Sequence, residues 1–152
     1  MFKPLLDQPD AYRLDRLKVY DSILSLGNQV EQAGGEASNQ TLHTKCNLAK
    51  NIVISGMGGS ALSGRIIRSL DQYILNVPLE IVTNYRLPNY VSKSSLVILS
   101  SYSGDTEETL SAAADALARG ASIFVITTGG KLLAFAKKNK INLEFPWAKL
   151  KP

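Results

Sequence analysis

The chain has 152 residues, of which 45% are hydrophobic and 20% charged, the balance of an ordinary globular domain and unlike that of disordered or fibrous proteins. Its net charge of +4 favours anionic small molecules and is weak support for nucleic-acid binding, because the basic run Lys137, Lys138 and Lys140 lies at a predicted helix end. No apolar run has the length of a membrane helix, and the single Cys46 has no partner for an internal disulfide, so we expect a cytoplasmic protein without membrane association.

The first forty-odd residues predict a helix and a loop ahead of the main domain. Asp10 is a candidate cap for a helix running to about Gln32, and Gly34-Gly35 is expected to end it before a polar loop that extends to residue 44. The helix carries two apolar stripes, formed by Leu14, Leu17 and Leu24 and by Val19, Ile23, Leu26 and Val30. Two stripes need two covering surfaces, so this helix is a candidate element of a homodimer.

From residue 51 the pattern changes to short apolar strands that alternate with amphipathic helices. Strands are predicted at residues 52–54, 79–83, 96–99, 123–126 and 142–145. The helices between them carry Leu62, Ile66, Ile67 and Leu70, then Leu110, Ala113, Ala114 and Leu117, and a third covers residues 132–138. This alternation predicts an α/β fold with a doubly wound, flavodoxin-like parallel sheet of five strands in the order 2-1-3-4-5, covered on both faces. We expect the domain to span residues 45–145, and residues 146–152 to begin a linker.

The loops after the first and third strands are the unusual parts of the sequence. Residues 55–60 read Ser-Gly-Met-Gly-Gly-Ser, and residues 100–106 read Ser-Ser-Tyr-Ser-Gly-Asp-Thr. In the predicted order these strands are neighbours where the winding reverses, which is where such sheets bind ligands. Glycines allow close backbone approach, hydroxyls donate hydrogen bonds, and each loop leads into a helix whose first N–H groups are unpaired. The two loops therefore predict an anion site without a fixed positive charge.

Simpler interpretations of each loop exist. Glycine turns after strands are common, and Asp105 with Glu108 has the spacing of a capping box, so part of the second loop is open to a purely structural role. A dinucleotide site is disfavoured because the second strand lacks an acid near its end, Glu80 lying at its start. A P-loop is excluded because no Gly-Lys-Ser/Thr follows the glycine turn.

At these loops the sequence resembles a sugar isomerase (SIS) domain, and more closely the N-terminal half of the bifunctional phosphoglucose/phosphomannose isomerases. The stretches that carry the resemblance are residues 56–61, 87–91, 101–109 and 127–132. The resemblance implies that Gly59 and Ser60 lie against a bound sugar, with Gly58 beside them among the substrate-binding residues. It also implies that the phosphate is bound by the hydroxyl residues Ser101, Ser103 and Thr106. The chain departs from the family at Asp105, where Asn is usual, and an acid there would either weaken phosphate binding or cap a helix.

The sequence offers no convincing catalytic base for an aldose–ketose isomerase, which must move a proton between C1 and C2. The candidates are His43 in a polar loop, Glu107 and Glu108 at the phosphate end, and Glu80 and Glu144 at strand positions away from the loops. Family members carry two SIS domains and take the base and a ring-opening histidine from the second, which this chain does not reach. We therefore assign no catalytic residue, and we expect neither a cofactor nor a metal.

Three functions remain open for such a chain. The first is the sugar-phosphate-binding domain of an isomerase that interconverts glucose or mannose 6-phosphate with fructose 6-phosphate. The second is a stand-alone sugar-phosphate sensor, which needs the two loops and no base. The third is a single-domain isomerase that borrows its base from a neighbouring subunit and acts on a different sugar phosphate.

Overall fold

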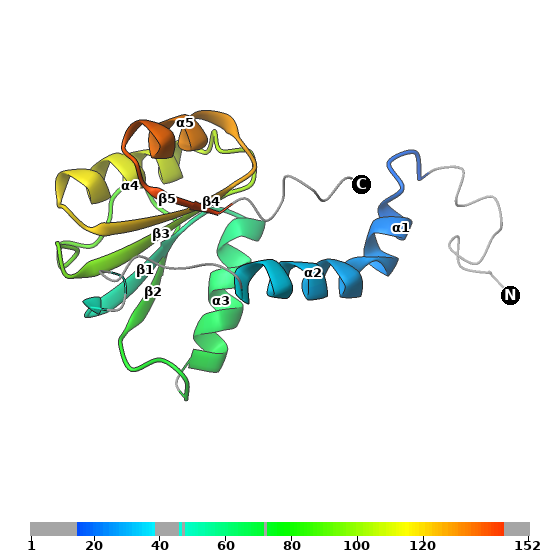
Figure 1. The fold of residues 1–152 in the computed structure, drawn as a ribbon, viewed down its shortest axis with the longest axis horizontal. Coiled ribbons are helices and arrows are strands. Elements are labelled where there is room, and N and C mark those ends of the chain that lie inside the picture. Colours follow the sequence, from blue (N-terminus) through cyan, green and yellow to red (C-terminus); the bar gives the residue numbers. More distant parts are fainter. Residues whose placement is uncertain (1–14, 39–45, 47, 72, 145–152) are drawn as a thin grey trace, which may run out of the picture. The chain divides into compact units, whose positions relative to one another are not determined.

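The computed structural model describes residues 15–38, 46, 48–71 and 73–144 of the chain (Figure 1). It divides into two units, residues 1–40 with 149–152 and residues 41–148. The first unit holds α1 (Val19–Leu24) and α2 (Leu26–Ser38), and the second holds the strands and the remaining helices of the described chain. The predicted linker at residues 146–152 lies outside the described residues.

The N-terminal helical segment is two helices where the sequence predicted one. The expected cap, Asp10, lies outside the described residues, as does Leu14 of the first stripe. Asp15 caps α1, because its carboxylate accepts the N–H groups of Val19 and Tyr20, each at 2.8 Å. Ser25 then separates α1 from α2.

The expected helix stop at Gly34-Gly35 is wrong, because α2 runs through both glycines to Ser38. A glycine usually ends a helix by adopting a left-handed conformation, and neither of these has a positive φ. The described members of the two apolar stripes are exposed: Leu17, Val19, Ile23, Leu24, Leu26 and Val30.

Unit 2 is built on a parallel sheet whose main strands follow the predicted order. The strands are β1 (Asn51–Ser55), β2 (Leu79–Val82), β3 (Ser95–Ser101) and β4 (Ser122–Thr127). They lie in the order β2-β1-β3-β4, which confirms the α/β fold and the predicted 2-1-3-4 arrangement. A short β5 (Asn142–Glu144) pairs in parallel with the outer edge of β4. Because all strands run the same way, the loops that leave β1, β3 and β4 share one edge of the sheet.

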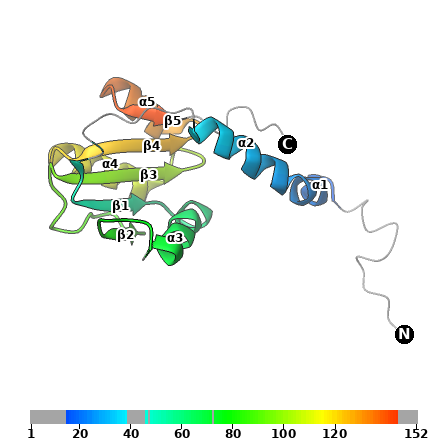
Figure 2. The ribbon, with the colours of Figure 1, turned by 60° about the horizontal axis from the view of Figure 1, so that its bottom comes forward.

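The helices of unit 2 cover the two faces of the sheet unequally. α4 (Glu107–Ala118) and α5 (Gly130–Lys138) lie on one face and α3 (Gly59–Asp71) lies on the other (Figures 1 and 2). Right-handed crossovers demand this, because β1–α3–β2 and β3–α4–β4 step in opposite directions across the sheet. The core forms on the α4 and α5 side, from Val53, Val97, Leu99, Val125, Ala112, Ala113, Ala116, Leu132 and Ala136.

The segment between β2 and β3 packs on the same face of the sheet as α4 and α5. Leu87 and Val91 are buried in the core. The carboxylate of Asp115 on α4 accepts the Leu87 N–H at 3.2 Å, and Arg119 donates to the Pro88 carbonyl at 2.7 Å. These bonds hold the start of the segment, at the carboxyl end of β2, against α4.

Among the described helices, none is both long enough and apolar enough to span a membrane.

The packing of α3 on the opposite face differs from what its apolar pattern suggested. It meets the sheet through Ala61 and Gly64, and a Cβ added at Gly64 would lie 3.2 Å from Ile81 and 3.3 Å from Ile54. The large apolar side chains that marked this helix in the sequence are all exposed: Leu62, Ile66, Ile67 and Leu70.

Candidate functional site

The glycine loop after β1 and the hydroxyl loop after β3 lie next to each other. β1 and β3 are paired along their length, with Ser55 opposite Leu99. Gly56, the first residue after β1, lies so close to the end of β3 that an added Cβ would stand 2.8 Å from the Ser100 carbonyl oxygen. A side chain at residue 56 would therefore push the two loops apart, so glycine is required for their approach.

The hydroxyl loop is organised around Ser101, which is buried. Its Oγ accepts the Gly104 N–H at 3.1 Å and lies 2.8 Å from Thr106 Oγ1. The two hydroxyls together carry two protons, and the bond between them uses one. The other proton remains to be donated to a ligand. Thus the hydroxyl loop is held by internal hydrogen bonds and still has one hydroxyl proton available to a ligand.

Ser103 and the start of α4 supply further donors at the same place. Ser103 Oγ accepts the Asp105 N–H at 3.2 Å, so its own proton is free for another acceptor. Thr106 is the N-cap residue of α4 and makes no side-chain capping bond, because its hydroxyl faces Ser101. The first N–H groups of α4 have no partner within the helix, and such a terminus attracts anions.

Asp105 does not form the capping box that its spacing to Glu108 suggested. The N-cap of α4 is Thr106, and the Asp105 carboxylate instead accepts the backbone N–H of Lys131 at 3.1 Å. Asp105 therefore caps α5, the next helix along the chain. This explains structurally why an acid or an amide is suitable at this position.

The loop after β4 supports the hydroxyl loop from the other side. The Thr128 hydroxyl donates to the Tyr102 carbonyl at 2.6 Å, and the Leu132 N–H donates to the Gly104 carbonyl at 2.9 Å. Gly104 has φ +74°, and an added Cβ there would collide with the Gly129 carbonyl oxygen. The sequence singled out residues 127–132 only through the family resemblance, and their supporting role depends on contacts across the sheet.

The glycine loop leaves open space in front of its backbone. The Ser60 N–H donates to Met57 O at 3.0 Å and the Ala61 N–H to Gly58 O at 3.2 Å, so these two donors are already used. Gly58 has φ +53°, which favours glycine. A Cβ added at Gly58 or at Gly59 would meet nothing within 4 Å. The glycine loop is therefore open at Gly58 and Gly59, where a ligand can lie close to the backbone.

Two carboxylates stand in the first turn of α4, and a tyrosine from another loop holds one of them. The Tyr85 hydroxyl donates to Glu107 Oε2 at 3.3 Å. The pKa of Tyr85 is raised above its ordinary value of 10.0, first by the charge of Glu108 and then by desolvation and the charge of Glu107. Sequence reasoning missed Tyr85, although its position just past the carboxyl end of β2 is a signal for site residues.

A family model for the SIS domain matches residues 47–145. The chain belongs to the SIS domain family. A bifunctional phosphoglucose/phosphomannose isomerase of Caldicellulosiruptor bescii is 43% identical over 121 residues, which cover 80% of this chain and 36% of that protein. Another, of Thermoplasma acidophilum, is 46% identical over 82 residues, or 54% of this chain and 26% of the relative. The chain thus spans about a third or less of the length of these relatives.

Solved structures agree on the fold of this SIS domain. The NanR protein of Vibrio vulnificus, complexed with ManNAc-6P, superposes with a TM-score of 0.60 over 83% of this chain and 53% of its own. The sequence identity is 19%, so the likeness concerns the fold.

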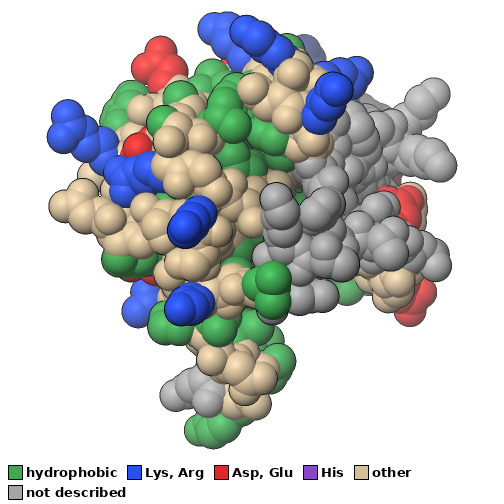
Figure 3. Space-filling model, turned by 60° about the vertical axis from the view of Figure 1, so that its left-hand side comes forward, with side chains coloured by type: hydrophobic (Ala, Val, Ile, Leu, Met, Phe, Trp, Pro, Cys, Tyr) green, Lys and Arg blue, Asp and Glu red, His purple; other side chains and the backbone are tan. Residues whose placement is uncertain are grey.

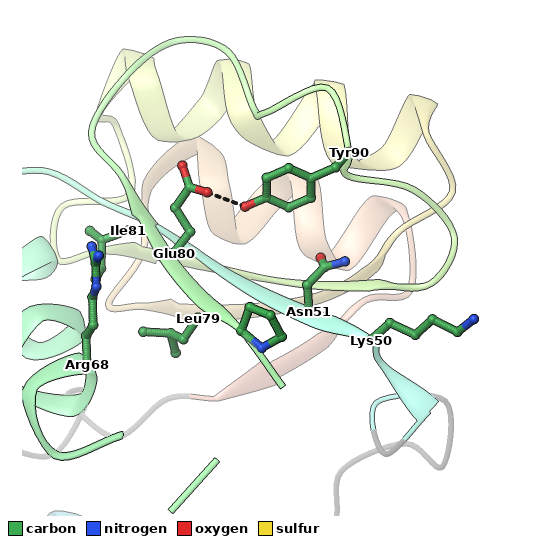
Figure 4. Close-up of a pocket in the computed structure, with 8 residues that line it drawn as sticks. Lys50, Asn51, Arg68, Leu79, Glu80, Ile81 and Tyr90 are labelled. Atoms are coloured by element: carbon green, nitrogen blue, oxygen red, sulfur yellow. Dashed lines mark hydrogen bonds between the residues drawn. The ribbon is translucent and has the colours of Figure 1, made fainter. Parts of the chain in front are cut away.

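The base candidates whose side chains the structure describes divide between the two ends of the sheet. Glu80 accepts a 2.5 Å hydrogen bond from Tyr90 at the edge of the sheet where the strands begin, the far end from the candidate site (Figure 4). Burial and this bond raise the pKa of Tyr90 to about 12. His43 lies outside the described residues, as does the side chain of Glu144. Glu107 and Glu108 lie beside the hydroxyl loop, at the start of α4.

The basic residues Lys137 and Lys138 lie at the end of a helix, as the sequence predicted. Figure 3, turned toward the edge where the strands begin, shows several Lys and Arg side chains together at the top of the face and others spread over the rest of it. Lys137 and Lys138 occupy the last turn of α5, where cations complement the helix dipole. Within the described part of the chain, no group of three His, Cys, Asp or Glu side chains is placed to hold a metal ion.

Proposed function

We propose that this SIS domain binds a 6-phosphorylated sugar and is the substrate-binding part of an isomerase that interconverts glucose or mannose 6-phosphate with fructose 6-phosphate. The observation that carries the proposal is the Ser101–Thr106 hydroxyl pair, which retains a proton to donate beside the open backbone of the glycine loop. The two relatives described above are bifunctional phosphoglucose/phosphomannose isomerases, which supports the reaction class.

In this proposal the phosphate lies against the hydroxyl loop and the N-terminus of α4. Ser101 or Thr106 donates one hydrogen bond, Ser103 a second, and the first amides of α4 donate others. A hydrogen bond to a charged group contributes about 1.5–3 kcal/mol, so three or four suffice for useful affinity without a lysine or arginine. The sugar then extends along Gly58, Gly59 and Ser60.

The proposed base lies outside the described residues. Isomerisation needs a group that moves a proton between C1 and C2, several bonds from the phosphate. Glu107 lies in the first turn of α4, beside the proposed phosphate position rather than the C1–C2 end, and Glu80 is at the opposite edge of the sheet. We therefore assign no catalytic residue in this chain and propose that a second domain of the whole protein supplies the base.

The remaining features of the proposal are its domain limits and assembly. The sugar-phosphate-binding domain spans residues 45–145, preceded by the helical segment at residues 1–44 and followed by the start of a linker. The protein is proposed to act in the cytoplasm as a homodimer, without a cofactor.

A sensor is the second candidate, because the described residues provide binding groups without a base. The extent of the gene distinguishes the two. A reading frame that continues past Pro152 into another α/β domain favours the isomerase. A stop codon there, with a partner protein recruited when ligand binds, favours the sensor.

The decisive measurement is a calorimetric titration of the chain with fructose 6-phosphate and, separately, with inorganic phosphate. We expect both to bind, and we expect the double variant Ser101→Ala, Ser103→Ala to lose both. Normal binding by the double variant would show that the site is wrongly assigned. Turnover of fructose 6-phosphate by this chain alone, at the rate of a full-length relative, would show that the chain contains a base after all.

A further inference from the structure

A cavity lies at the edge of the sheet where the strands begin, at the opposite end from the candidate sugar-phosphate site (Figure 4). Its volume is about 560 Å³, within the range of about 300–1,000 Å³ that is typical of small-molecule sites. The cavity is lined by the start of β1, by β2, by Arg68 in the last turn of α3 and by Tyr90 from the segment between β2 and β3. None of the described residues that line it belongs to the glycine loop or the hydroxyl loop, so the two sites are separate.

The cavity wraps around the outer edge of β2, which is an edge strand of the sheet. Successive side chains of a strand alternate between its two faces. Val82 belongs to the core on the α4 side, so Glu80 faces that side as well. Ile81 faces the other side, where it lies against Gly64 of α3. Because Glu80 and Ile81 both line the cavity, a ligand there lies along β2 and reaches polar groups from both faces of the sheet.

Three polar side chains of the cavity have hydrogen-bonding capacity that the described residues do not use. Glu80 Oε2 accepts the Tyr90 hydroxyl at 2.5 Å, and no described residue donates to Oε1. Asn51 Oδ1 is buried and has no donor among the described residues, which is costly for an acceptor. The Arg68 guanidinium is exposed, and no described side chain pairs with it. A ligand that satisfies these three groups carries an anionic group and at least two N–H or O–H donors.

The order of these groups along the cavity matches the order of the parts of a nucleotide. Figure 4 shows Arg68 at one end, then the Glu80 carboxylate, and then Tyr90 and Asn51. Arginine binds phosphate through paired N–H donors, and an acidic side chain accepts ribose hydroxyls. The Tyr90 ring is 47% exposed, and aromatic rings stack on bases. An asparagine amide matches the amino group and ring nitrogen of adenine.

We propose that this cavity binds an adenine nucleotide with a single phosphate. Arg68 donates to the phosphate, Glu80 Oε1 accepts a ribose hydroxyl, and the base stacks on the Tyr90 ring. The Asn51 amide turns about its terminal torsion, which has a broad minimum. It then accepts from the adenine amino group and donates to the ring nitrogen beside it. Lys50 lines the end away from Arg68, and two cations against one carboxylate give the described lining a positive charge that favours an anion.

The first test is a calorimetric titration of the complete chain with adenosine 5′-monophosphate. The variant Ser101→Ala, Ser103→Ala is titrated as well, because a nucleotide phosphate could also bind the hydroxyl loop. We expect this variant to bind one molecule per chain. Arg68→Ala is expected to weaken that binding about tenfold or more. Arg65→Ala, at an exposed arginine of α3 that does not line the cavity, is the matched control and is expected to bind normally. Absence of binding, or equal losses in the two arginine variants, would overturn the proposal.

A second titration tests the contact to the base. Inosine 5′-monophosphate has a carbonyl oxygen in place of the adenine amino group, so we expect it to bind about tenfold more weakly. This difference is expected to vanish in Asn51→Ala, which a general loss of stability would not cause. Equal affinity of the wild type for both nucleotides would overturn the assignment of adenine.

The two binding sites can fail independently. Loss of adenosine monophosphate binding in the double serine variant, with binding kept in Arg68→Ala, would place the nucleotide at the hydroxyl loop and overturn the cavity site. Failure of the wild type to bind fructose 6-phosphate would reject the proposed function and leave the nucleotide site standing.

Discussion

The carboxylate of Asp105 accepts the backbone N–H of Lys131 at 3.1 Å and so joins the hydroxyl loop to the first turn of α5. An asparagine side chain preserves this oxygen and removes the negative charge from beside the candidate anion site. We expect Asp105→Asn to leave stability nearly unchanged and to strengthen phosphate binding several-fold. Asp105→Ala removes the cap and is expected to cost about 1 kcal/mol of unfolding free energy. Urea unfolding and calorimetric titration of the two variants test this, and equal stability for both would contradict a capping role.

Ser103 and Ser101 are expected to differ in how far they affect the fold. Ser103 is exposed, so Ser103→Ala is expected to weaken phosphate binding about tenfold or more with little change in stability. Ser101 is buried and accepts the Gly104 N–H, so Ser101→Ala loses affinity and also about 1–3 kcal/mol of stability. Titration alongside thermal unfolding separates the two effects. Full affinity in Ser103→Ala would remove that residue from the site.

Gly59 and Gly104 provide a matched pair of alanine substitutions. A Cβ at Gly59 meets nothing within 4 Å, so Gly59→Ala is expected to keep or slightly raise stability and to weaken sugar-phosphate binding by blocking close approach. Gly104→Ala introduces a collision and a strained φ of +74°, and is expected to destabilise the fold strongly. Thermal unfolding with and without fructose 6-phosphate distinguishes them. Unchanged affinity in Gly59→Ala would mean that no ligand lies against that backbone.

Tyr85 is expected to keep the Glu107 carboxylate away from bound phosphate. Tyr85→Phe releases the carboxylate and is expected to weaken phosphate binding by about two- to fivefold, the range for an exposed interaction. In a Glu107→Gln background the same change is expected to have no effect, since there is no charge to restrain. A double-mutant cycle of binding free energies measures the coupling. An equal loss in both backgrounds would show that Tyr85 acts independently of Glu107.

The raised pKa of Tyr90 predicts a specific loss of stability at high pH. The folded state holds the phenolic proton up to about pH 12, whereas the unfolded chain releases it near 10.0. The contribution of this group is therefore complete below pH 10 and declines between pH 10 and 12. Urea midpoints of the wild type and Tyr90→Phe, measured at pH 8, 10 and 11, are expected to converge as pH rises. Curves that stay parallel would exclude the Tyr90–Glu80 hydrogen bond as the cause.

The sequence by itself determined the strands, their order and the two unusual loops. Continuous apolar runs such as residues 96–99 predict buried parallel strands. The glycine and hydroxyl residues that follow them indicate, from their own properties, close backbone approach and hydrogen-bond donors. The same local reasoning failed at Gly34 and Gly35, because a glycine ends a helix only when its backbone turns left-handed, and surrounding helix formation prevents that here.

Only the tertiary structure decided which hydrogen-bond partners the polar groups have and which side of α3 faces the sheet. Asp105 reaches a residue 26 positions away, and Tyr85 reaches Glu107 across 22 positions. The spacing to Glu108 suggested a local cap for Asp105, and nothing local distinguishes the two outcomes. Likewise the apolar pattern of α3 predicts an amphipathic helix but not its rotation. Close packing of Gly64 on Ile54 and Ile81, with Ala61 buried on the same side, selects that rotation and leaves the large side chains outside.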